Sequence, residues 1–204
     1  MLGTKYTLTD KQVEALQTVV RQGTEEAAKG LSAMVGQELR VFSPGIELVT
    51  LASIPHRMAS PGEPVVGIYL CSSGDIRSHF TLTFTVEAAK QLCDMLLGQP
   101  EESTVELGAM ERSALGEVGN ITASYFLTSL AKVTGLVIHP SPPAVLVDMC
   151  GAVLDIAIAD IGQHADDALI METSLLLDGR QVTGYFLAMP DPRSLTTILE
   201  SLEK

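Results

Sequence analysis

Residues 113–120 read Ser113-Ala-Leu-Gly-Glu117-Val-Gly-Asn120 and lie inside a helical pattern that we expect to run from Val105 to Thr134. At 100° per residue, the polar positions Ser113, Glu117, Asn120 and Ser124 share one narrow stripe of that helix. The opposite face carries Ala114, Leu115, Val118, Thr122, Tyr125 and Phe126. The sequence therefore predicts a helix that packs on a core and presents a carboxylate and an amide, one turn apart, to solvent.

Two glycines, Gly116 and Gly119, interrupt this helix. A glycine in a helix interior costs roughly 1 kcal/mol relative to alanine, so each position needs a physical reason. Two explanations are open. Both glycines permit another surface to approach the polar stripe, or Gly119 packs tightly against the sheet below it.

The pattern around this helix occurs twice in the chain. A shift of 99 residues superposes Leu16 on Leu115, Val19 on Val118, Gly36 on Gly135 and Pro44 on Pro143. We interpret this as an internal duplication, with repeat 1 at residues 7–99 and repeat 2 at residues 103–204. The two halves are expected to pack into one pseudo-symmetric domain that spans residues 1–204.

Each half is expected to contain a long helix, two short strands, a longer hairpin and a closing helix. The predicted helices are 7–36, 86–97, 105–134 and 191–202, and the predicted strands are 39–42, 46–51, 65–71, 76–84, 136–139, 145–148, 168–177 and 181–189. Cys150 to Ile161 fits a strand or a short helix equally well. The fold class is therefore α/β of the α+β type, with long helices packed on an antiparallel sheet built by both halves.

Composition restricts the classes of partner. The chain has 204 residues, of which 46% are hydrophobic and 19% are charged, which indicates a globular protein. Its formal net charge of -12 argues against a nucleic-acid or anionic-membrane surface. A protein partner is the better expectation.

The cysteines and the N-terminus point to the cytoplasm. Cys71, Cys93 and Cys150 are odd in number, widely spaced and without a C-x-x-C, so we expect reduced core thiols and no metal site. The first residues have no apolar segment typical of a secretion signal, and no stretch is apolar enough to span a membrane.

The spacing Ser113-x3-Glu117-x2-Asn120-x22-Pro143, with Gly119-Asn120-Ile121 and a helix that ends at Gly135, resembles the phosphatase signature of the CheC/CheX/FliY family of bacterial chemotaxis. The resemblance extends over nearly the whole chain and is closest to CheC. It implies a CheC-like fold and an aspartyl-phosphate phosphatase that acts on a phosphorylated response regulator of the CheY type.

The resemblance also implies roles for the motif residues. The Asn120 amide would orient the attacking water, and Glu117 would accept a hydrogen bond or ion pair from the lysine beside the receiver's phosphate. Ser113 would form local hydrogen bonds, Gly116 and Gly119 would allow close approach, and Pro143 would shape the turn below the site. No cofactor of its own is expected, because Mg²⁺ would stay with the receiver domain.

The first half has lost the same residues. Glu14, Thr18 and Arg21 occupy the positions that match Ser113, Glu117 and Asn120, while Pro44 is retained at the position of Pro143. Arginine has donors and no acceptor, so it cannot orient a water as an amide oxygen can. One active site is therefore expected, beside a degenerate first site.

Two other functions compete with the phosphatase. The same face would serve a non-enzymatic adaptor that binds a receiver domain or a CheD-like deamidase. A flagellar-switch component similar to FliY is disfavoured, because the chain ends at Lys204 without room for an appended switch domain.

Overall fold

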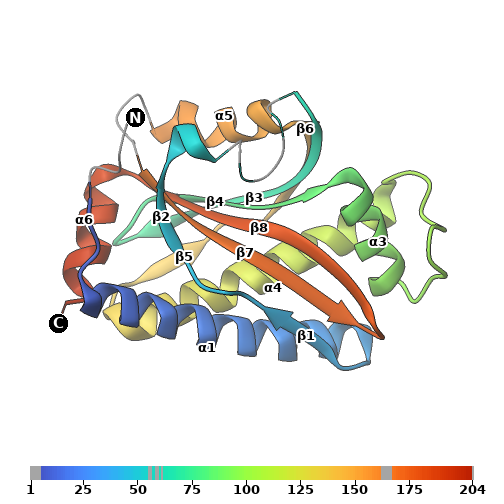
Figure 1. The fold of residues 1–204 in the computed structure, drawn as a ribbon, viewed down its shortest axis with the longest axis horizontal. Coiled ribbons are helices and arrows are strands. Elements are labelled where there is room, and N and C mark those ends of the chain that lie inside the picture. Colours follow the sequence, from blue (N-terminus) through green and yellow to red (C-terminus); the bar gives the residue numbers. More distant parts are fainter. Residues whose placement is uncertain (1–5, 55–56, 58–59, 61, 162–166, 204) are drawn as a thin grey trace.

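The structure is a computed structural model that describes residues 6–54, 57, 60, 62–161 and 167–203. Its described residues form an antiparallel sheet of eight strands with helices on both faces. The long helices α1 (Asp10–Val35) and α4 (Ala109–Thr134) lie side by side along one face, and α5 (Cys150–Ile161) covers part of the other (Figure 1). Long helices on an antiparallel sheet were predicted, and this fold class is confirmed.

The strands are β1 (Leu39–Phe42), β2 (Glu47–Thr50), β3 (Pro64–Gly74), β4 (Ser78–Thr85), β5 (Ile138–Pro140), β6 (Ala144–Met149), β7 (Asp167–Leu177) and β8 (Arg180–Pro190). Their order is β1-β7-β8-β4-β3-β5, with β2 also paired to β7 and β6 also paired to β3. Each half thus contributes a long hairpin to the centre and two short strands to one edge. An internal duplication would produce this order, and the repeat boundaries 7–99 and 103–204 stay a prediction.

The two long helices have matching ends. In α1, the Thr9 side chain accepts a hydrogen bond from the Gln12 N–H, and the Gln12 side chain accepts one from the Thr9 N–H, which completes a capping box. Gly36 ends α1 at φ 71°, and Gly135 ends α4 at φ 74°. Both glycines adopt the left-handed conformation that glycine tolerates best at a helix C-terminus.

Helix α4 begins at Ala109, not at Val105 as the apolar pattern predicted. The buried Asp94 carboxylate explains the difference, because it accepts hydrogen bonds from the Ser103 hydroxyl at 2.9 Å and from the Thr104 N–H and hydroxyl at 2.9 and 2.6 Å. These bonds hold the preceding loop in place. The helix starts only after Gly108, whose backbone is extended at φ -75° and ψ -164°.

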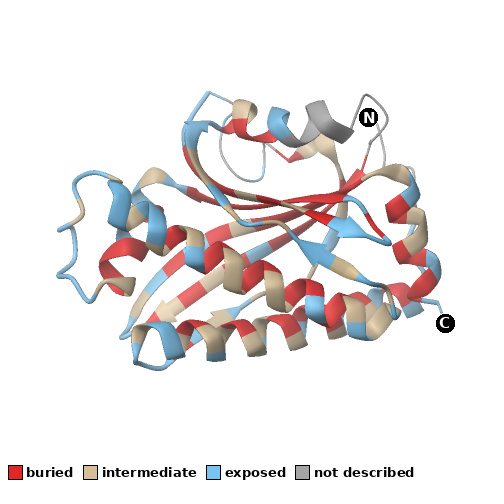
Figure 2. Ribbon diagram, turned by 180° about the vertical axis from the view of Figure 1, so that it is seen from behind, coloured by how far each residue is buried: buried red, intermediate tan, exposed pale blue. Residues whose placement is uncertain are grey.

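The larger core lies between the sheet and the helices α1, α4, α3 (Val86–Leu96) and α6 (Pro192–Ser201). Phe126 of α4 contacts Phe186 of β8 here, with ring centroids 4.9 Å apart. Figure 2 shows that the buried residues of both long helices face the sheet. Burial of one face in this way stabilises an amphipathic helix far more than its intrinsic propensity does.

Residues 150–161, whose sequence was compatible with a strand or a short helix, form helix α5. This helix packs on a smaller core on the opposite face of the sheet. Val153 and Leu154 of α5 are buried against the sheet. Gly67 of β3 leaves room for this contact, because a Cβ there would lie 2.6 Å from the Val153 Cγ1. In the first half, the place of α5 in chain order is taken by the short helix η1 (Leu51–Ser53).

Candidate active site on helix α4

The polar stripe of α4 lies on its solvent side. Glu117 and Ser113 are exposed and Asn120 is half-buried, whereas the neighbours Leu115 and Val118 are both 0% exposed. Within the described part of the chain, no hydrogen bond or ion pair engages the side chain of Glu117 or Asn120. A carboxylate and an amide are therefore accessible to a visiting molecule, one turn apart on a rigid helix.

The two glycines have different environments. A Cβ on Gly119 would lie 2.2 Å from the Ile68 Cγ2 of β3, whereas a Cβ on Gly116 would meet Val145 of β6 at an ordinary 3.7 Å. Gly119 therefore lets α4 pack close to the sheet, which is the second of the two explanations that the sequence left open. The expectation that Gly119 serves the approach of a partner is corrected on this point, while Gly116 lies at the surface beside the stripe.

The connection between β5 and β6 lies beside α4. The Ser141 N–H donates to the Cys71 carbonyl at 2.8 Å, and the Ser141 hydroxyl accepts from the Cys71 N–H at 3.0 Å, which fixes this turn to β3. Pro143 follows in the same turn and is half-buried. The hydrogen bonds of Ser141 thus hold this turn, and the expected role of Pro143 in shaping it stays a prediction.

Arg112 adds a contact that sequence reasoning missed. Its Nε donates to the Leu107 carbonyl at 3.0 Å, and its Nη1 lies 3.5 Å from the Val145 carbonyl. The side chain thereby connects the first turn of α4 with the end of the preceding loop and with β6. The acceptors are main-chain carbonyls, which carry no residue-specific signal in a sequence.

The matching surface of α1 has different chemistry. The Thr18 hydroxyl donates to the Glu14 carbonyl at 3.1 Å, which satisfies it within its own helix. Arg21 lies 3.9 Å from Glu25 in an exposed ion pair, and Pro44 is exposed. This face presents a guanidinium and no amide at the position of Asn120.

The described residues contain neither a cluster of metal-ligating side chains nor a helix that could span a membrane. They contain no group of three or more His, Cys, Asp or Glu side chains that could hold a metal ion. None of their helices combines the length and apolar character needed to cross a bilayer.

Known proteins are similar to this chain both around α4 and along most of its length. The CheC-like family matches residues 110–147, a segment that contains Ser113, Glu117, Asn120 and Pro143. The chain is 27% identical to the CheY-P phosphatase CheC of Bacillus subtilis over 95% of its own length and 94% of that protein. The chain is therefore similar to CheC-like proteins, both in the segment around the candidate site and along most of its length.

Solved structures of this family share the fold. FliY of Thermotoga maritima superposes with a TM-score of 0.77 at 18% identity, and the match covers 97% of this chain and 98% of FliY. CheX in the CheX-CheY-BeF3-Mg complex of Borrelia burgdorferi superposes with a TM-score of 0.50 at 21% identity, over 85% of this chain and 98% of that one. At such identities these matches establish a common architecture, and function has to be argued from the site.

Proposed function

We propose that this protein is a CheC-like phosphatase that accelerates hydrolysis of the aspartyl phosphate on a CheY-type response regulator. Glu117 and Asn120 of α4 would enter the receiver's active site, which supplies the phosphorylated aspartate, a lysine and Mg²⁺. The water oxygen attacks phosphorus in line, and the bond from phosphorus to the aspartate oxygen breaks. Inorganic phosphate leaves and the aspartate carboxylate is restored.

Asn120 would position the water. Phosphoryl transfer needs little covalent work from a protein, because most of the acceleration comes from positioning and charge stabilisation. The amide oxygen can accept a hydrogen bond from the water while the amide N–H₂ donates to a phosphoryl oxygen. Glutamine orients the attacking water of GTPases by the same principle.

Glu117 would dock the helix. Its exposed carboxylate can pair with the receiver's lysine by a charge-assisted hydrogen bond, which becomes stronger when the interface excludes water. The contact would hold α4 in one register on the receiver, so that Asn120 reaches the water. Ser113 and Gly116 would border this contact, and Pro143 would support the adjoining turn.

One observation carries this proposal: Glu117 and Asn120 are accessible and unengaged in the described structure, and the two residues between them, Val118 and Gly119, are buried and seat the helix on the sheet. The similarity to a CheY-P phosphatase along 95% of the chain supports the same reaction.

The test follows the decay of phosphate label on purified receivers from the same organism, with and without this chain. Wild-type protein should accelerate the decay at substoichiometric amounts, whereas an adaptor would only sequester the receiver. Asn120→Ala should reduce the acceleration by roughly a hundredfold, and Thr128→Ala, exposed on the same helix two turns further on, should leave it unchanged. If Asn120→Ala accelerates the decay as much as wild type does, the proposed mechanism is wrong. If wild-type protein does not accelerate the decay of any receiver, the protein is not the proposed phosphatase.

A further inference from the structure

A break in strand pairing opens a cavity in the first half of the chain. Strands β1 and β2 both pair with β7, but the pairs Phe42 with Ser174 and Glu47 with Ile170 leave residues 43–46 outside the ladder. Pro44 has no N–H to donate, and Gly45 has φ 145°, a backbone conformation that suits glycine. The segment therefore bends away from β7.

The corresponding break in the second half is closed. Between β5 and β6, the main-chain and side-chain hydrogen bonds of Ser141 to Cys71 bridge to β3. In the first half, the Ser43 hydroxyl instead bonds within its own turn, to the Gly45 N–H at 3.3 Å and the Gly45 carbonyl at 3.2 Å. The gap beside β7 thus remains open, whereas the hydrogen bonds of Ser141 bridge the equivalent gap beside β3.

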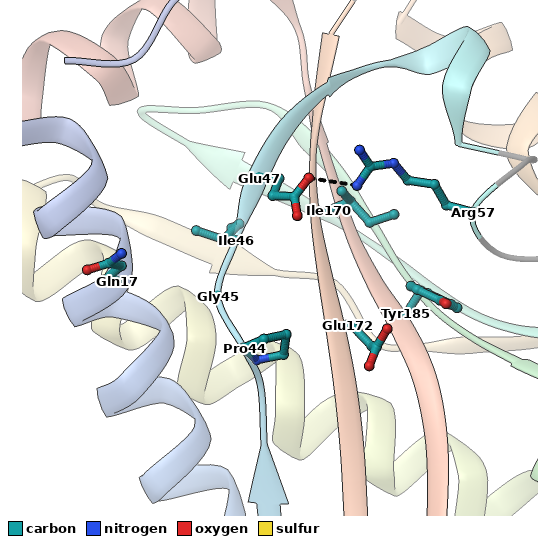
Figure 3. A pocket seen from close by; sticks show the side chains of 9 residues that line it. All are labelled: Gln17, Pro44, Gly45, Ile46, Glu47, Arg57, Ile170, Glu172 and Tyr185. Carbon is teal, nitrogen blue, oxygen red and sulfur yellow. Dashed lines mark hydrogen bonds and ion pairs between the residues drawn. The ribbon is translucent and has the colours of Figure 1, made fainter. Parts of the chain in front are cut away.

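The resulting cavity has a volume of about 380 Å³ (Figure 3). This size lies within the range of roughly 300–1,000 Å³ that is typical of small-molecule sites. Pro44 and Ile46 line it from the bent segment, and Ile170 lines it from β7. Ile170 provides an apolar surface next to the polar groups, whereas the Ile46 side chain packs against the larger core and points toward α1 (Figure 3).

Charge is unbalanced in the cavity. Arg57 donates to Glu47 at 2.7 Å, and the exposed Glu172 carboxylate of β7, at the mouth of the cavity, has no hydrogen bond or ion pair to any described residue. Tyr185 of β8 lies next to Glu172 across the ladder. Burial raises the pKa of the Tyr185 hydroxyl, Glu172 adds to the rise and Arg57 opposes it, so these three groups share one electrostatic environment.

We propose that this cavity binds an aliphatic cation, an ammonium or guanidinium group on a short apolar stem. The cationic head would pair with Glu172 and donate to the Tyr185 hydroxyl oxygen, and the stem would cover Pro44 and Ile170. Two sources offer this chemistry: a free amine, and a lysine or arginine side chain of a protein partner. The site is separate from α4 and does not depend on the proposed phosphatase activity.

Calorimetric titration tests the site on the full-length chain. The probes are cadaverine as a free diamine, Nα-acetyl-lysine methylamide as a protein-like lysine, and 1-pentanol as a neutral control. Glu172→Gln should weaken binding of the cations by about fivefold, and more if the head group is well desolvated. Glu200→Gln removes an exposed carboxylate of α6 and should leave binding unchanged.

The two cations distinguish the sources. Preference for cadaverine assigns the site to free amines, and preference for the capped lysine assigns it to a partner side chain. Equal affinity of wild type and Glu172→Gln, equal binding of 1-pentanol, or absence of binding by both cations would overturn the proposal. Urea unfolding of each variant checks that the fold is intact, and Glu172→Asp provides a second variant that keeps the charge.

Discussion

Gly119 of α4 lies so close to Ile68 of β3 that a Cβ atom on Gly119 would stand 2.2 Å from the Ile68 Cγ2. Real Cβ atoms do not approach side-chain carbons to this distance, so one element would have to move. The contact fixes how deeply α4 is seated on the sheet. It thereby also sets the height of Asn120, the next residue, above the protein surface.

Replacement of Gly119 with alanine should destabilise the protein. The clash falls on the Cγ2 methyl of the buried Ile68 and, at this short distance, costs about 2–3 kcal/mol, whereas alanine recovers only about 1 kcal/mol in helix propensity. We expect a net loss of about 1–2 kcal/mol in the free energy of unfolding, measured by urea denaturation. Stability equal to wild type would show that α4 can move away from Ile68 without cost.

Gly116→Ala is the matched comparison. A Cβ there would meet Val145 at 3.7 Å, an ordinary contact, so alanine should raise the free energy of unfolding by up to about 1 kcal/mol. The same methyl group lies beside the polar stripe and should slow dephosphorylation if a receiver backbone comes close at this point. Full activity together with higher stability would place the receiver elsewhere on α4.

The fold was accessible from sequence because hydrophobic periodicity and glycine caps repeat along the chain. Gly36 and Gly135 end their helices as predicted, since a left-handed C-terminal residue is a local requirement. The start of α4 was placed four residues early, at Val105 instead of Ala109, because the side chain that organises the preceding loop, Asp94, belongs to another helix. Local patterns cannot reveal such a contact.

The position of the candidate site could be predicted from the sequence to the same degree as the fold. Helical spacing brought Ser113, Glu117 and Asn120 to one exposed stripe, and the structure places them there. The sequence could not show why residue 119 is a glycine, because spacing alone does not reveal which atoms of β3 lie below it. The cavity beside Glu172 was also beyond reach, since it arises from a break between strands that are far apart in sequence.

Asn120→Ala should lower the receiver dephosphorylation rate by roughly a hundredfold, or about 2.7 kcal/mol in activation free energy, while affinity for the receiver changes little. The reason is that the amide acts on the water in the transition state more than on docking. Glu117→Gln should instead weaken receiver binding, because it removes the charge that faces the lysine. Rates measured at saturating receiver separate the two effects, and a pure binding defect in Asn120→Ala would contradict the assignment.

The thiol of Cys93 should resist alkylation under native conditions. Burial, with added repulsion from Glu111 and Asp94, raises the pKa of Cys93 to about 12, so almost no thiolate is present at pH 8. The partly exposed Cys71 should react first with iodoacetamide, as measured by mass spectrometry of the digested protein. Modification of Cys93 as rapid as that of Cys71 would show that α3 opens locally on the time scale of the reaction.

The stability that Asp94 contributes should depend on pH. Burial alone would raise the pKa of this carboxyl, but the hydrogen bonds from Thr104 and Ser103 outweigh it and hold the pKa below its ordinary value. A carboxyl with a lower pKa in the folded state stabilises the fold above its unfolded-state pKa, and this contribution is lost as pH falls through the folded-state pKa. Asp94→Asn should therefore reduce the free energy of unfolding by about 2 kcal/mol at pH 7 and by clearly less at about pH 3. An equal deficit at both pH values, in urea titrations of the two proteins, would mean that the anchor of the loop before α4 does not depend on the charge.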